Sequence, residues 1–163
     1  MTNFPIIQPY QMQILCNTSM LFFLPFMYSM LYKDIHKMSL RLPSSEIILP
    51  IKNNDIKYTL GFISYITGIC SMLYWHDQNH DSWRYYLDLY MAKFSGICFF
   101  INGYMYILSP YKRRIAYTLC LSTIGFYYLS NTQYFEGKND WYIWHGIMHM
   151  FTIVGQTWVI HCI

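Results

Sequence analysis

Charged residues are scarce in this chain. They make up 12% of its 163 residues, against about a quarter in an ordinary soluble domain, while 55% of the residues are hydrophobic. A composition this apolar excludes a typical soluble domain, and the length suits one domain. The sequence therefore predicts a membrane protein.

Cysteine patterns for disulfides or metal clusters are also missing. No two of the five cysteines have the CxxC spacing, and all lie in or beside apolar segments (Cys16, Cys70, Cys98, Cys120 and Cys162). We therefore expect free buried thiols. No basic residue precedes the first apolar run, so a cleaved signal peptide is not expected. The net charge of +3 is small and the basic residues gather between apolar runs, which indicates membrane topology and no nucleic-acid partner.

What the chain has is a series of apolar stretches suited to membrane helices. They predict spans at about residues 14–32, 58–75, 85–109, 115–130 and 141–163. Pro25 interrupts the first span, which a membrane helix tolerates with a kink. Aromatic residues reach 20%, and we expect Trp83, Trp141 and Trp144 at the bilayer interfaces. The predicted fold is all-α, an integral membrane helical bundle that forms a single transmembrane domain over residues 1–163.

The basic residues are divided unevenly between the two sides of this bundle. Residues 33–57 and 110–114 connect spans on one side and hold eight of the eleven lysines and arginines, whereas the other side has Arg84 and Lys138. Basic connections stay on the cytosolic side of a membrane. The N-terminus is therefore expected to be exoplasmic or lumenal and the C-terminus cytosolic or equivalent. Residues 47–51 are apolar but too short to cross a bilayer, and we expect them at its surface.

The last span contains the most unusual polar residues. His145 and His149 are four positions apart and share one helical face, which Thr152 and Gln156 continue. Ionisable residues inside a membrane usually mark a functional site. The alternative is that the two rings only hydrogen-bond to neighbouring helices. Both interpretations stay open on this pair alone.

The predicted topology brings more ionisable residues to the same depth. His76 ends the second span, Asp88 begins the third and His145 begins the last, all toward the side with few basic residues, and His149 lies one turn deeper. Three imidazoles and a carboxylate are the donor set of a catalytic zinc site, in which the metal activates a water molecule. A site at this depth would meet lipid substrates directly.

These residues resemble those of a known family. The segment 145–155 resembles the HxxxHxxTxxG segment of the alkaline ceramidases, within the larger membrane-hydrolase superfamily that includes the adiponectin receptors. Ser71, His76 and Asp88 resemble the upstream serine, histidine and aspartate of that family. The resemblance implies a zinc ion held by His76, His145 and His149, and it implies Asp88 and Ser71 as catalytic residues near the metal-bound water.

The chain also departs from the family pattern. The family has seven spans where five are predicted here, and its serine stands four residues before the histidine, whereas Ser71 stands five before His76. The N-terminal segment has no acidic residues, so the calcium-binding segment of the ceramidases has no counterpart. These differences indicate a truncated or divergent member.

Three functions follow as hypotheses. The resemblance implies a zinc-dependent hydrolase that acts on a ceramide-like lipid amide, with membrane lipids as partners. The second is a non-catalytic structural or accessory subunit of a larger membrane complex, respiratory or virion, that keeps a ceramidase-like fold; small size and the near absence of a soluble part favour it. The third is a membrane protein that binds haem through two histidines from different helices.

Overall fold

The described part of the chain is helical apart from short connections. The computed structural model describes residues 7–39, 51–76 and 82–163. These residues form α1 (Pro9–Met20), α2 (Phe23–Ser39), α3 (Ile51–His76), α4 (Trp83–Tyr106), α5 (Pro110–Phe135) and α6 (Trp141–Cys162). The predicted all-α fold is confirmed for these residues. All five cysteines are free, as predicted, but only Cys70 is buried and the other four are partly exposed.

The first two helices are the halves of one broken helix, called here the α1–α2 helix. Pro25 has no N–H group with which to bond the carbonyl of Leu21, so the helical ladder is interrupted there. The connection tightens, and the N–H groups of Leu21 and Phe22 donate to the carbonyls of Thr18 and Ser19. The kink predicted at Pro25 is therefore a break that lies one turn before it.

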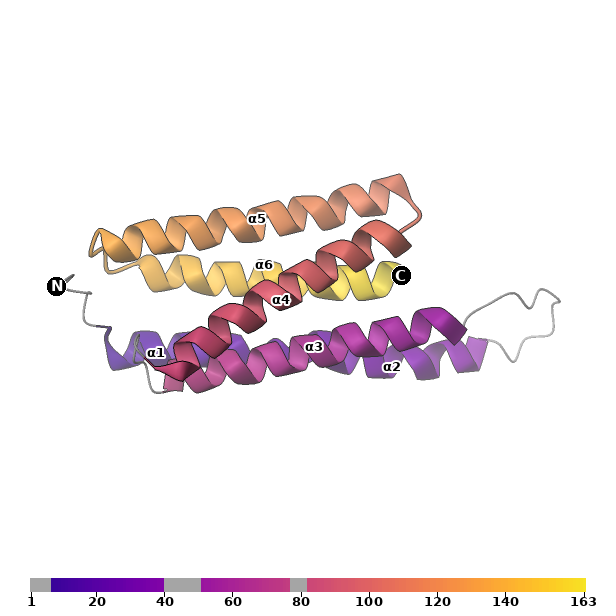
Figure 1. Ribbon diagram of the computed structural model, residues 1–163, viewed down its shortest axis with the longest axis horizontal. Helices are drawn as coiled ribbons and strands as arrows, with labels where there is room; N and C mark the ends of the chain where they lie inside the picture. The colour runs from indigo at the N-terminus through magenta and orange to yellow at the C-terminus, as the bar shows by residue number, and fades with distance from the viewer. Residues whose placement is uncertain (1–6, 40–50, 77–81) are drawn as a thin grey trace.

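The helices form two antiparallel pairs with α4 between them (Figure 1). The α1–α2 helix lies beside α3, and α5 lies beside α6. The fourth helix runs obliquely from the end of α3 to the start of α5 (Figure 1). Because α6 contacts all five other helices, its side chains meet those of the whole bundle.

Small residues on α3 let it approach the α1–α2 helix closely. A Cβ atom added at Gly68 would lie 2.8 Å from Cβ of Phe22, and one added at Gly61 would lie 2.8 Å from Cβ of Ser29. Between these glycines, Ser64 is fully buried. Close approach over small residues is the usual way in which helices pack inside a membrane.

The α1–α2 helix, α3 and α5 are longer than the spans predicted for them. The fifth helix continues to Phe135 because Ser130 and Tyr134 are buried, and the ring of Tyr134 packs against that of Trp141 at 5.0 Å. The polar turn expected from residue 131 is therefore confined to residues 136–140, where Gly137 has a φ of 71°. Most of the apolar segment 47–51 lies outside the described residues, as do residues 77–81 of the connection before α4.

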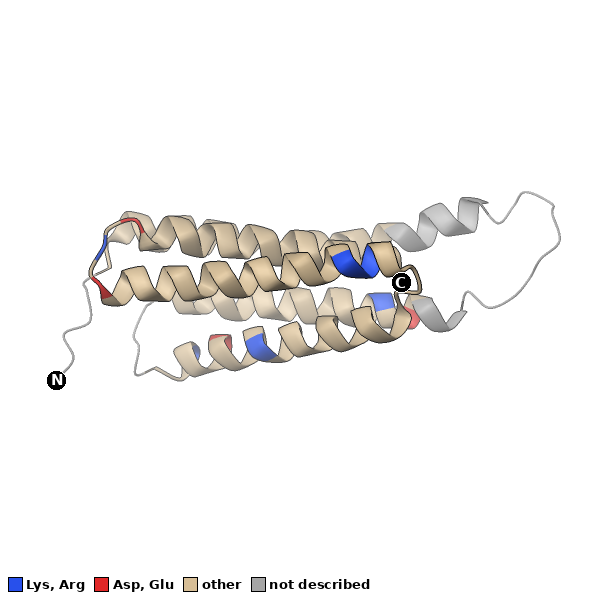
Figure 2. Cartoon of the chain, turned by 90° about the horizontal axis from the view of Figure 1, so that it is seen from above, with Lys and Arg blue, Asp and Glu red and all other residues tan. Residues whose placement is uncertain are grey.

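The surface of the bundle is apolar over much of its length. Among the described residues, two helical stretches could cross a membrane by length and composition, Pro9–Leu31 and Asn54–His76. Large side chains on α5 are exposed by two thirds or more, for example Leu121 at 68% and Tyr128 at 73%. Charged residues gather mainly toward the two ends of the bundle, with a few more along α4 (Figure 2). An exposed apolar surface of this kind is typical of contact with lipid or with another protein.

Candidate functional site

Two histidines on α6 lie in the middle of the candidate site. The rings of His145 and His149 touch edge to face, with their centroids 4.9 Å apart. His149 is only 3% exposed and His145 is half-buried. Gln156, farther along the same face, is also buried. The predicted polar stripe of this helix is therefore present and points into the bundle.

Each ring meets a hydroxyl group from another helix. Thr18 Oγ1 of α1 lies 3.0 Å from His149 Nδ1, and Ser130 Oγ of α5 lies 3.2 Å from His145 Nδ1. These contacts tie α6 to its neighbours on both sides, as the hydrogen-bonding interpretation of the pair expects. They also fix the rotation of both rings, and they leave the two Nε2 atoms to other partners.

The predicted serine and aspartate also come together, again beside α1. Ser71 Oγ of α3 lies 2.9 Å from Ser19 Oγ and lies beside the Asp88 carboxyl of α4. Ser19 follows Thr18 directly in the last turn of α1. One turn of α1 therefore touches both His149 and the Ser71–Asp88 pair. The term polar site is used below for Thr18, Ser19, Ser71, Asp88, Ser130, His145 and His149.

The contribution of α1 is the part of the site that sequence reasoning missed. Two adjacent hydroxyl residues inside an apolar run, Thr18 and Ser19, were a local signal of a helix that contacts polar partners. Their partners lie 131 and 52 positions away in the sequence, so spacing along the chain could not identify them.

His76 does not join the polar site. It is the last residue of α3 and is exposed, whereas its neighbour Trp75 is 4% exposed and contacts the ring of His145 at a centroid distance of 5.1 Å. Over residues 7–39, 51–76 and 82–163, no group of three or more His, Cys, Asp or Glu residues could hold a metal ion. The side chains brought together supply two of the three predicted nitrogen ligands, so they do not fit a three-histidine zinc centre.

The arrangement does not favour a haem between the paired histidines either. His145 and His149 come from one helix and touch each other, so a macrocycle has no room between their rings. His161, near the other end of α6, contacts Tyr28, whose hydroxyl lies 2.6 Å from its Nδ1.

A buried donor lies beside the site. Among the described residues, the indole Nε1 of Trp75 is buried and has no hydrogen-bond partner. Such orphaned donors are rare in folded proteins and call for an explanation. Because the Trp75 ring contacts the His145 ring, this N–H group lies close to the polar site.

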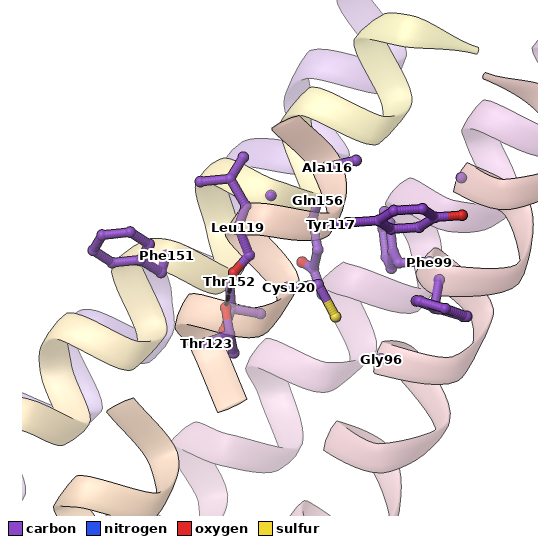
Figure 3. Close-up of a pocket in the computed structure, with 13 residues that line it drawn as sticks. Gly96, Phe99, Ala116, Tyr117, Leu119, Cys120, Thr123, Phe151, Thr152 and Gln156 are labelled. Carbon is purple, nitrogen blue, oxygen red and sulfur yellow. Dashed lines mark hydrogen bonds between the residues drawn. The ribbon is translucent and has the colours of Figure 1, made fainter. Parts of the chain in front are cut away.

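Farther along α6, beyond His149, the bundle contains a second polar cluster and a small pocket. The Gln156 amide lies 2.7 Å from Ser64 Oγ and 3.0 Å from Ser95 Oγ, which joins α6 to α3 and α4. The pocket has a volume of about 90 Å³ and lies between α4, α5 and α6 (Figure 3). It starts at Phe151 and Thr152 on α6, about one turn beyond His149, and its lining is mostly apolar.

Comparison with known proteins identifies no relative. The chain matches no family model, no curated protein and no solved structure. The functional assignment therefore starts from the residues and their geometry.

Proposed function

We propose that the chain is an integral membrane protein with five spans, formed by the α1–α2 helix and by α3, α4, α5 and α6. The apolar outer surface and the gathering of charges toward the ends of the bundle support this arrangement. The basic residues Lys112, Arg113 and Arg114 begin α5, at the end of the bundle where α6 finishes (Figure 1). This end would face the cytosol or its equivalent, and the N-terminus would be exoplasmic or lumenal.

Within this membrane protein, the proposed activity is that of a lipid hydrolase of the alkaline ceramidase type, which cleaves the amide of a ceramide-like lipid. One observation carries the proposal. Ser71 and His149 both contact the last turn of α1, through Ser19 and Thr18, while Asp88 lies beside Ser71 and His145 beside His149. Four of the five residues that the ceramidase resemblance selects are therefore neighbours inside the bundle.

The chemistry proposed for these residues is general acid–base catalysis. Asp88 would accept a proton from the water that attacks the amide carbonyl and would return it to the leaving amine, so that the products are a fatty acid and an amine. Ser71 lies beside the carboxyl of Asp88. The unpartnered N–H of Trp75 is suited to bind the oxygen that becomes negative during attack.

Zinc is the cofactor that the resemblance implies, and its binding can be measured directly. The experiment is the metal content of purified protein, wild type against His149→Ala and His76→Ala. The resemblance predicts one zinc per chain in the wild type and its loss in His149→Ala, whereas the two histidines brought together in the described part of the chain, without a third, predict protein without zinc. Retention of zinc in His76→Ala would identify a site that does not use the exposed histidine, and a wild type without zinc would contradict a zinc enzyme.

Catalysis is tested separately with labelled ceramide in detergent micelles. The Asp88→Asn variant should lose at least ~100-fold in hydrolysis, the usual minimum contribution of a general base. The matched control is Asp140→Asn, because Asp140 is an exposed carboxylate just before α6. Equal rates in the wild type and Asp88→Asn would contradict the proposed role of Asp88.

A non-catalytic subunit of a larger membrane complex is the second proposal. Two observations favour it. The side chains brought together in the described residues lack the third histidine of the predicted zinc site. Hydroxyl groups of other helices contact Nδ1 of both histidines, as in a purely structural network. It predicts protein without metal or hydrolase activity, and partner proteins that co-purify in mild detergent. Zinc with ceramide hydrolysis in the isolated chain would exclude it.

A further inference from the structure

The hydroxyl group of Thr18 has two partners and only one proton. Its Oγ1 lies 3.0 Å from the carbonyl oxygen of Leu15 and 3.0 Å from His149 Nδ1. A carbonyl oxygen only accepts, so both hydrogen bonds can form together only if Thr18 donates to Leu15 and accepts from an N–H group of the ring. We infer that Thr18 is a positioning residue that holds His149 in the tautomer protonated at Nδ1, with an unprotonated Nε2.

The neighbouring serine is compatible with this assignment. Ser19 Oγ lies 2.8 Å from the same Leu15 carbonyl and 2.9 Å from Ser71 Oγ. Ser19 donates to the Leu15 carbonyl and accepts from Ser71, so both of its contacts form without changing the hydrogen bonds of Thr18. Thr18 and Ser19 each contact the Leu15 carbonyl, and they also contact His149 and Ser71, respectively. All four hydrogen bonds can form together only when His149 donates to Thr18. If Thr18 donated to the ring, its bond to Leu15 would be lost.

The other ring nitrogen supports the same tautomer. His149 is 3% exposed, and its only hydrogen-bond partner among the described residues is Thr18. A proton on Nε2 would therefore be a donor without an acceptor among the described residues, whereas a proton on Nδ1 has Thr18 as its acceptor. An unprotonated Nε2 carries a lone pair instead, which can bind a metal ion or accept a proton.

Packing holds the His149 ring in this orientation. The Phe22 ring lies against His149 at a centroid distance of 5.4 Å, and His145 lies against it at 4.9 Å. The carbonyl of Thr18 accepts the N–H of Leu21, which holds the last turn of α1 in place. With Nδ1 bound to Thr18 and two rings packed against it, the imidazole offers only Nε2 to a ligand.

A role for Thr18 in hydrolysis rests on the proposed function, whereas the tautomer itself rests on geometry alone. The test is nuclear magnetic resonance of protein with isotopically labelled histidine nitrogens, in lipid nanodiscs without added metal or substrate. The signal of His149 is assigned by its loss in His149→Gln. In the wild type we expect a protonated Nδ1 and an unprotonated Nε2.

Three variants separate positioning from general damage. Thr18→Val keeps the shape of the side chain and should move the proton to Nε2 or give a mixture of tautomers, whereas Thr18→Ser should restore the wild-type pattern. Thr157→Val is the control, because the Thr157 hydroxyl donates 2.8 Å to its own helix at Ile153 and does not reach the site. It should leave the His149 signals unchanged.

The outcomes remain distinct from those of the hydrolase test. A wild-type His149 protonated at Nε2 would overturn the inference, and so would a Thr18→Val spectrum identical to the wild type. If Thr18→Val does not fold, the wild type and Thr18→Ser still decide the tautomer. Nδ1 protonation in a protein without ceramide hydrolysis would support the inference and contradict the proposed activity.

Discussion

Replacing Gly68 with alanine should weaken the bundle, although the same change usually strengthens a helix. The added Cβ would lie 2.8 Å from Cβ of Phe22 and 3.2 Å from the carbonyl oxygen of Ser19. Carbon atoms prefer a separation of about 3.5–4.0 Å, so the helices would have to move apart by roughly 0.7–1.2 Å. Neither neighbouring atom is the end of a flexible side chain that could turn away.

The expected magnitude follows from two opposing effects. Overpacking of this kind destabilises a protein by about 1–3 kcal/mol, and the higher helix propensity of alanine offsets about 1 kcal/mol of that loss. The free energy of unfolding of Gly68→Ala should therefore fall by about 1 kcal/mol. For a chain of this size, the midpoint of thermal unfolding would drop by about 2–4 °C.

A second glycine provides the matched control. Gly125 lies in the middle of α5, is exposed, and has no atom within 4 Å of an added Cβ. Gly125→Ala should raise the midpoint, because only helix propensity changes. Both variants are compared with the wild type by circular dichroism in one detergent. If Gly68→Ala is stabilised as much as Gly125→Ala, α3 does not approach the α1–α2 helix as closely as described.

Further predictions concern hydrogen bonds and a surface ion pair, and the same unfolding assay checks them. Gln156→Leu removes two interhelical hydrogen bonds of roughly 0.6 kcal/mol each and should cost about 1 kcal/mol, with Thr157→Val as the neutral control. Arg113 donates from Nε and Nη2 to the carbonyl of buried Ile107 at 3.0 and 2.8 Å, so Arg113→Gln should cost about 1.5 kcal/mol and Arg114→Gln nothing measurable. A hydrogen bond to a glutamate raises the pKa of Lys138, but both partners are half exposed, so Lys138→Gln should leave the midpoint unchanged.

The sequence predicted the helices better than their ends. Long apolar runs identify helical segments, and the break near Pro25 follows from the missing N–H group. The ends were misjudged where polar residues continue a helix, as at the end of α5, because Ser130 and Tyr134 are buried by contacts with α6. Such contacts depend on tertiary packing and leave no periodic signal in the chain.

The candidate site was predictable only in part, for reasons of helix geometry. Spacing placed His145 and His149 on one face, and their rings do touch. Ser71 and His76 are five positions apart, about 140° round a helix, so they cannot point in the same direction. The structure agrees, since Ser71 is buried and His76 is exposed. The hydroxyl groups of α1 were not predicted, because nothing within one sequence connects residue 18 with residue 149.

The contact between Thr18 and His149 has a consequence for biogenesis. Its two partners are 131 positions apart, so the ribosome releases the first helix long before the sixth is synthesised. During that interval the Thr18 hydroxyl has no His149 ring to contact. Assembly of the polar site must therefore be a late event in folding, and a chain arrested before α6 would have its early helices but neither His145 nor His149.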